Sequence, residues 1–163
     1  MKTADQVIDE LSLSPHPEGG WFRRTYECNS LVHSSNGVRP ASTAIFYLLK
    51  RGEVSRLHFL DADEVWYFHQ GAPLSLHIFD QGQYRVVNLG NTQSIASRFQ
   101  IMICAGTIFG AMPDSDSSYD WSLVSCSVSP GFLEKGFFWP DMEKMRINYK
   151  KMESILDALA PLD

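Results

Sequence analysis

The sequence predicts an all-β protein: a single domain with a β-sandwich or barrel and one helix near each end. The 163 residues are a usual length for one domain, and 44% apolar with 20% charged residues is typical of a packed globular chain. Past residue 20, short apolar segments alternate with turn residues. We therefore expect one domain over residues 1–163, with helices at about 3–13 and 141–159 and β-structure over about 18–138.

The leading helix is predicted from its capping pattern. Thr3 followed by Gln6 has the spacing of a capping box, in which each side chain accepts a hydrogen bond from the other residue's backbone. Ser14 and Pro15 end the helix because proline does not continue one. Between these ends, apolar residues recur at helical spacing, at Val7, Ile8 and Leu11.

Eight segments are predicted to be strands because apolar and β-branched residues recur in them and turn residues separate them. They are residues 21–28, 42–49, 54–60, 64–69, 74–79, 84–89, 100–104 and 122–128. Residues 80–83 have the composition of a hairpin turn. Residues 31–39 are polar and are expected to form a loop, a candidate lid over a pocket.

The closing helix is predicted from an apolar face. Its members are spaced by three and four residues: Met142, Met145, Tyr149, Met152, Leu156 and Leu159. The opposite face is mixed in charge, which favours docking onto the domain or a partner subunit over a membrane or calmodulin-like role.

Charge and composition exclude several classes of partner. The formal charge of −5, with no run of basic residues, gives no field for nucleic acid. The acidic start offers no signal peptide and no apolar stretch is long enough to span a bilayer, so we expect a cytoplasmic protein without membrane contact. Cys28, Cys104 and Cys126 are widely separated and are expected to be reduced thiols, and Cys104 would need a partnered base to act as a nucleophile.

The segment from Gly52 to Gly71 carries the polar residues with the clearest chemical pattern. His58 lies on one predicted strand and Glu64 on the next. Because alternate residues of a strand share a face, His58 shares its face with Leu60, and Glu64 shares its face with Trp66 and Phe68. If both faces turn inward, the two side chains meet inside the domain. The alternative is a buried structural pair with no chemical role.

This segment resembles the first motif of the cupin superfamily. That motif places a glycine, two histidines, a glutamate and a second glycine at fixed spacing. Gly52, His58, Glu64 and Gly71 fit it, and Leu60 stands where the second histidine is expected.

The second cupin motif is most similar to residues 104–109, where Gly106 is retained and Phe109 replaces a third histidine. The resemblance implies a cupin β-jelly-roll barrel in which two of the metal ligands are apolar. A transition-metal site normally needs about three protein ligands. We therefore expect no tightly bound metal or other cofactor, with weak metal binding through His58 and Glu64 left open.

Four further segments resemble a small cupin subfamily that opens with the sequence HPEGG: residues 16–23, 42–49, 63–66 and 128–132. Membership implies a jelly roll related to sugar-nucleotide epimerases and a homodimer, with no settled reaction. In the opening segment, His16, Glu18 and Arg23 are able to bind a polar ligand. We predict Glu18 and Arg23 as pocket residues, and a structural Glu–Arg ion pair is the alternative.

The leading functional hypothesis is a metal-independent isomerase or epimerase acting on a small polar or sugar-like molecule. His58 is the predicted general base, Glu64 orients its ring, and Tyr47 or Tyr67 supplies the opposing acid. Arg23 is predicted to hold an anionic group.

Aromatic residues are predicted to form the pocket wall or, alternatively, the core: Tyr47, Trp66, Phe68 and Phe109. The same residues suit a non-catalytic cupin that binds or senses a ligand. A metal-dependent cupin oxygenase is the third possibility, and the missing ligands weigh against it.

Overall fold

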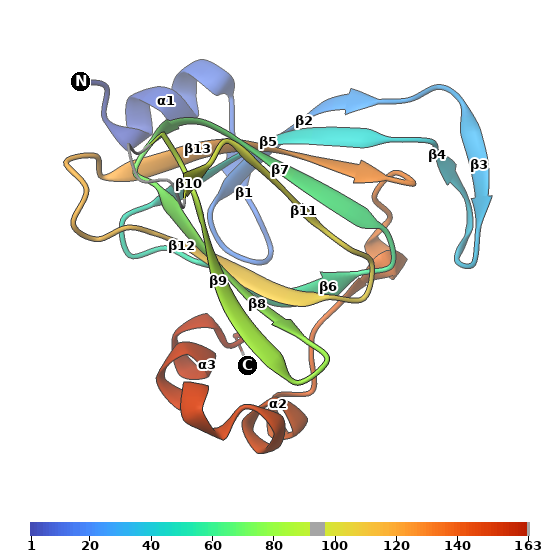
Figure 1. Ribbon diagram of the computed structural model, residues 1–163. Helices are drawn as coiled ribbons and strands as arrows, with labels where there is room; N and C mark the ends of the chain where they lie inside the picture. The colour runs from blue at the N-terminus through green and yellow to red at the C-terminus, as the bar shows by residue number, and fades with distance from the viewer. Residues whose placement is uncertain (92–96, 163) are drawn as a thin grey trace.

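The computed structural model describes residues 1–91 and 97–162. Residues 92–96, inside the range predicted for β-structure, and residue 163 lie outside the described residues. Two sheets face each other, with α1 (Ala4–Leu11) at one end and two C-terminal helices against the second sheet (Figure 1). None of the described helices is long and apolar enough to cross a membrane.

Within the described residues, the strands form two six-stranded sheets and one separate hairpin. The first sheet has the order β1 (Ser14–Pro15), β2 (Trp21–Glu27), β5 (Thr43–Lys50), β13 (Trp121–Ser129), β7 (Asp63–Gly71) and β11 (Gln100–Ile103). The second has the order β10 (Ser97–Arg98), β9 (Gln83–Leu89), β8 (Leu74–Asp80), β12 (Ile108–Pro113), β6 (Ser55–Leu60) and β14 (Phe137–Phe138).

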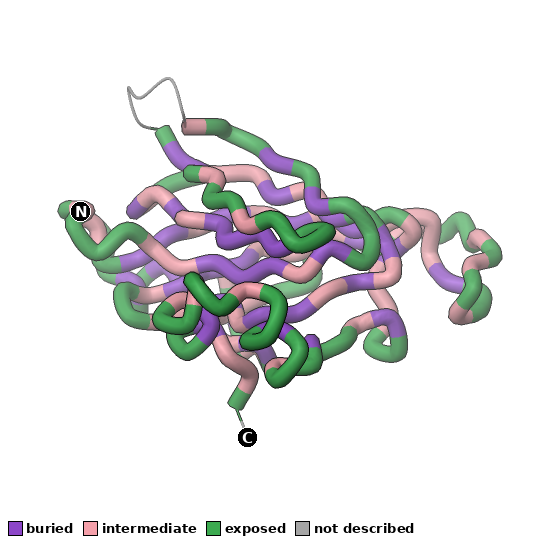
Figure 2. Tube along the Cα trace, turned by 60° about the horizontal axis from the view of Figure 1, so that its bottom comes forward, coloured by how far each residue is buried: buried purple, intermediate pink, exposed green. Residues whose placement is uncertain are grey.

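The main core lies between these sheets. Tyr47 and Trp66 project from the first sheet and pack in one buried cluster with Leu76, Ile78 and Phe109 of the second. Buried positions alternate with less buried ones along β11 and β13, as a two-layer arrangement requires (Figure 2). The predicted all-β jelly roll is confirmed, although the described strands form a sandwich of two sheets and do not close into a barrel.

All eight predicted strands are present, each within two residues at either end. The sequence did not predict β12, which lies at the centre of the second sheet between β8 and β6. Gly110 interrupts its apolar pattern, and a Cβ there would lie 2.8 Å from the Ser55 carbonyl oxygen. Gly110 therefore makes the strand hard to predict from the sequence, and its lack of a side chain allows β12 to lie close to β6.

The predicted loop over residues 31–39 is a hairpin of β3 (Leu31–Ser34) and β4 (Gly37–Pro40), so that prediction is wrong. Figure 1 shows it projecting away from the sheets. Its base is fixed because buried Arg39 donates from Nη1 to the Asp61 carboxylate over 2.8 Å. This bidentate ion pair explains why a polar segment is ordered.

The leading helix has the predicted capping box at Thr3, and its apolar face packs on Leu48 and Trp121. The closing segment differs from a single helix. It forms α2 (Met142–Asn148), a 3₁₀ turn η2 (Lys150–Met152) and α3 (Glu153–Leu159). Tyr149 leaves helical geometry at the break, packs its ring on Phe79 at 4.9 Å and accepts a hydrogen bond from the Gly82 backbone.

The predicted apolar face is nevertheless the buried one. Met145, Leu156 and Leu159 are buried against Leu57 and Phe79, on the outer side of the second sheet. Periodicity thus identified which residues are covered, while a tertiary contact decided where the helix breaks. A second 3₁₀ turn, η1 (Glu134–Gly136), directly precedes β14.

Candidate functional site

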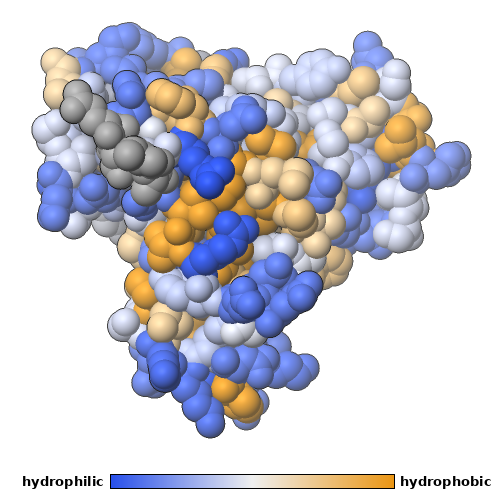
Figure 3. All heavy atoms as spheres, in the orientation of Figure 1, coloured by the Kyte–Doolittle hydropathy of each residue, from blue (hydrophilic) through white to orange (hydrophobic). Residues whose placement is uncertain are grey.

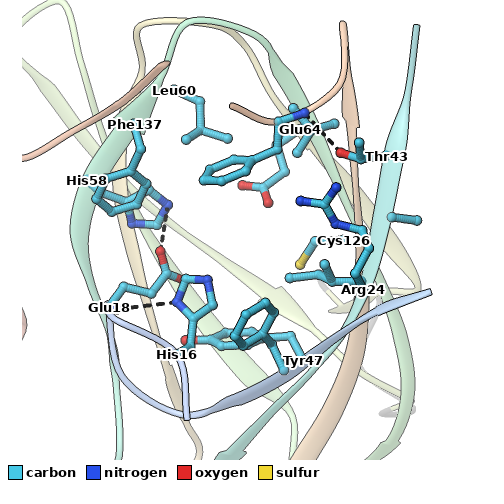
Figure 4. Close-up of a pocket in the computed structure, with 15 residues that line it drawn as sticks. His16, Glu18, Arg24, Thr43, Tyr47, His58, Leu60, Glu64, Cys126 and Phe137 are labelled. Carbon is cyan, nitrogen blue, oxygen red and sulfur yellow. Dashed lines mark hydrogen bonds and ion pairs between the residues drawn. The ribbon is translucent and has the colours of Figure 1, made fainter. Parts of the chain in front are cut away.

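A cavity of about 50 Å³ lies between the sheets, lined from β2, β5, β6, β7 and β13 and by the segment that precedes α2 (Figure 4). It has room for a few waters or a small polar molecule. Its wall is mostly apolar, and titratable side chains converge in it: His16, Glu18, Tyr47, His58 and Glu64. A pocket of apolar wall with a few converging polar groups is typical of a ligand site.

The turn at residues 16–20 brings Glu18 into this cavity. Gly19 has φ +107°, and a Cβ there would lie 2.2 Å from the Val54 carbonyl oxygen, so only glycine fits. The Tyr47 hydroxyl donates to the Gly19 carbonyl over 2.7 Å and fixes the turn from β5. Glu18 is only 6% exposed and lines the cavity, and its described side-chain partners are Ser55 and the histidines, not an arginine.

His58 is held in one orientation by its own strand. Its Nδ1 lies 2.7 Å from the Arg56 carbonyl oxygen, and since a carbonyl only accepts, Nδ1 carries a proton. Its Nε2 lies 3.3 Å from the Glu18 carboxyl, whose other oxygen accepts from Ser55 over 2.9 Å. A proton bound to either His58 Nε2 or the Glu18 carboxyl therefore lies within reach of the other group.

Burial shapes the charge of this pair. It raises the pKa of Glu18, and it lowers the pKa of His58 against a smaller opposite effect from the nearby Glu64 carboxylate. Both shifts favour a neutral acid donating to a neutral imidazole. The prediction that Glu64 orients the His58 ring is wrong, because the Arg56 carbonyl and Glu18 contact the two ring nitrogens.

Glu64 points into the cavity from β7, on another side of it from Glu18 (Figure 4). It is 7% exposed, and its Oε2 has no hydrogen-bond partner among the described residues. The buried indole N–H of Trp66 has no hydrogen bond within 3.5 Å, but it and the Cys126 thiol lie near enough to Glu64 to lower its pKa slightly. Burial raises the pKa of Glu64 to about 7, although the nearby His58 opposes the shift.

The arginine that lines the cavity is Arg24, one position after the predicted Arg23. Arg23 does not line the cavity; it lies with its guanidinium 5.9 Å from the Phe46 ring centre. Strand alternation places Phe22 and Arg24 on the inner side instead. The sequence did not fix this phase, because the adjacent residues Trp21 and Phe22 are both apolar and pack in different core clusters. Thr43 and Cys126 also line the cavity and were not predicted.

The predicted aromatic residues divide between wall and core. Tyr47 lines the cavity, whereas Trp66 and Phe109 are 1% exposed and pack behind it. Their rings meet edge to face, with centres 5.8 Å apart. Phe68 is half-buried, packs against the main core, and lies away from the cavity. The core interpretation therefore holds for these last three residues.

The residues present do not fit the metal that the cupin resemblance implies. Phe109 pairs with His58 in the strand register and packs on its ring at 4.5 Å, where a ligand histidine is expected. Leu60 lines the cavity at the other vacant position. In residues 1–91 and 97–162, no three His, Cys, Asp or Glu side chains are grouped so as to hold a metal ion.

Comparison with known proteins shows which family the chain matches. Residues 5–139 match the family described as cupin superfamily (DUF985). A solved protein from Shewanella oneidensis is 34% identical, with a TM-score of 0.89 and full coverage of both chains. A hypothetical protein from Leishmania major is 32% identical, with a TM-score of 0.88, covering 99% of this chain and 100% of that one.

More distant structures share the fold alone. An oxalate decarboxylase from Bacillus subtilis is 14% identical, with a TM-score of 0.55 over 91% of this chain and 37% of that one. No curated protein matches the chain.

Proposed function

Because this chain belongs to the DUF985 family of the cupin superfamily, we propose that its cavity catalyses proton transfer on a small polar molecule, as an isomerase or epimerase without a metal. One observation carries the proposal. The Glu64 carboxyl, buried and without a described partner at Oε2, lies across the cavity from the His58–Glu18 pair. An acid and a base on different sides of a ligand are what an enolisation needs.

The base and the acid are assigned from which groups can accept or donate a proton. Glu64, with a pKa of about 7, is suited to remove a proton from a carbon next to a carbonyl group. The His58–Glu18 pair delivers its proton to the carbonyl oxygen, which gives an enol. In an α-hydroxy carbonyl compound this enol is an enediol. Return of the Glu64 proton to the former carbonyl carbon gives the isomer, while the pair takes the proton of the other enediol hydroxyl and the first hydroxyl keeps its own. Return of the Glu64 proton to the original carbon, after the enediol has turned its opposite face to Glu64, gives the epimer, and the enol proton then goes back to the pair.

This assignment changes two roles predicted from the sequence. His58 acts with Glu18 as the acid in the first half of the reaction, and as the base only when the pair takes back a proton. Tyr47 is a poor acid here, because its hydroxyl donates to the Gly19 carbonyl and burial holds its pKa well above the ordinary value. We assign Tyr47 to the wall and to the turn that carries Glu18.

The test is solvent deuterium uptake by pyruvate, 2-oxobutyrate, hydroxyacetone and glyceraldehyde, followed by proton NMR in D₂O with chelator present. Wild type should accelerate exchange in at least one compound, and Glu64→Gln should lower that rate by about 100-fold or more. The control is Glu143→Gln, an exposed carboxyl on α2, which should exchange as wild type does.

Two results oppose the proposal. One is exchange in Glu64→Gln at the wild-type rate. The other is the absence of accelerated exchange in every compound, and if the compounds nevertheless bind, that result favours the ligand-binding alternative.

A further inference from the structure

We propose that the molecule bound in this cavity is a carboxylate, and that Arg24 with Thr43 forms the subsite for its carboxylate group. The inference rests on the proposed function only in taking this cavity as the ligand site. It assigns two residues that neither the cupin motifs nor the acid–base pair include.

Arg24 supplies the charge. It reaches the cavity from β2, and Figure 4 shows its guanidinium turned inward toward the space between Glu64 and Cys126. Glu27 accepts from Nη1 over 2.9 Å and is the one described acceptor for this side chain, so it holds the group at the cavity wall. The side chain is 35% exposed at the edge of the cavity, and its remaining guanidinium N–H groups can bind an acceptor that enters there.

Thr43 supplies a second donor on the same wall. It is 2% exposed and lines the cavity from β5. Its oxygen accepts from the Phe132 backbone N–H over 2.9 Å, while its hydroxyl hydrogen has no acceptor among the described residues. A buried donor left unpaired is costly, which points to an acceptor that the ligand brings.

The donors are grouped in one part of the cavity. Arg24 and Thr43 present them from β2 and β5, and Figure 4 shows the Glu18 carboxyl on the opposite side, with the Glu64 carboxyl between. Arg24 is the one lysine or arginine among the described residues that line the cavity. A single guanidinium matches the one charge and planar fork of a carboxylate, whereas a phosphate dianion would need further cationic groups.

The experiment measures binding of acetate, propionate and pyruvate against acetamide, propionamide and pyruvamide, by amide NMR shifts at Ala44 and Ile45 of the cavity wall. Inorganic phosphate is the comparison anion. In wild type the carboxylates should bind at least tenfold tighter than their amides. Arg24→Gln should remove that difference, and Arg23→Gln, its neighbour on the outer face, should keep it.

Thr43 is tested by a pair of variants. Thr43→Val should weaken carboxylate binding several-fold, and Thr43→Ser, which keeps the hydroxyl, should restore it. Retained amide dispersion in each variant shows that it folds.

The proposal is overturned if Arg24→Gln binds the carboxylates as wild type does, if amides bind equally well, if phosphate binds tighter than all three carboxylates, or if no carboxylate shifts the cavity amides at tens of millimolar. These outcomes leave the proposed acid–base chemistry standing, since deuterium uptake by the uncharged hydroxyacetone tests it separately.

Discussion

Glu64 is the residue on which the chemistry depends most. A carboxyl group taken out of water with one oxygen unpaired loses its hydration without full compensation, so its charged form is disfavoured. The result is a pKa of about 7 against an ordinary 4.5. The same shift suits this group to proton transfer at neutral pH and lowers the free energy of unfolding. The ionised carboxylate has lost its hydration in the folded state and keeps it in the unfolded chain.

The sign of this effect gives a prediction for Glu64→Gln. Between pH 4.5 and about 7 the folded protein keeps a proton that the unfolded chain has released, so wild-type stability falls as pH rises through this range. The loss contributed by Glu64 is complete above pH 7 and amounts to about 3 kcal/mol. Urea denaturation at pH 4 and pH 8 should show Glu64→Gln gaining about that much relative to wild type at the higher pH. If the difference in free energy of unfolding between Glu64→Gln and wild type is the same at both pH values, the pKa of Glu64 is not raised in the folded protein.

At the scale of the element, the turn at residues 16–20 matters most, because it brings Glu18 against β6, the strand that carries His58. Its geometry depends on Gly19, where the backbone φ is positive and the Val54 carbonyl occupies the space of a Cβ. A side chain at this position must therefore move the turn, and Glu18 with it.

We predict that Gly19→Ala lowers the free energy of unfolding by more than about 2 kcal/mol, from backbone strain and the clash together. Gly82 is the matched control, because it also has positive φ, at +77°, and has nothing within 4 Å of its Cβ position. Gly82→Ala should cost about 1 kcal/mol, from backbone strain alone. Equal costs for the two variants, measured by urea denaturation, would show that the approach to Val54 does not constrain the turn.

The elements also show what the sequence was able to predict. Strand positions followed from local alternation, and the buried face of the C-terminal helices followed from periodicity. The partner of His58 did not, because Glu18 reaches it through a turn whose docking depends on contacts about 30 to 40 residues away along the chain. The phase of β2 was ambiguous for a related reason: two adjacent arginines follow Phe22, and only packing decides which one faces the cavity.

For the molecule as a whole, the cupin frame is kept while apolar side chains occupy two positions where the family has metal ligands. Leu60 and Phe109 fill two ligand positions with apolar side chains, and Glu18 enters from the N-terminal turn as the new partner of His58. The outer surface carries apolar residues too, which gather over the middle of the face in Figure 3. The homodimer and the cytoplasmic location remain predictions, and sedimentation velocity tests the first.

Metal content tests this replacement on the intact protein. Protein purified without chelator should hold far less than one iron, manganese, nickel or zinc ion per chain, because a transition-metal site needs about three protein ligands. Added chelator should leave the melting temperature unchanged. Near-stoichiometric metal that disappears in Glu64→Ala would mean that the remaining histidine and carboxylates bind an ion after all.

The most direct test of the account is the titration of Glu64 itself, followed by ¹³C NMR of its side-chain carboxyl carbon and assigned by the loss of that signal in Glu64→Gln. The account predicts a midpoint near pH 7, chiefly because the group is buried, with a smaller contribution in the same direction from the Glu18 carboxyl across the cavity. A midpoint near the ordinary 4.5 would contradict it, since Glu64 would then be a hydrated or fully paired carboxylate and not the base of a proton-transfer site.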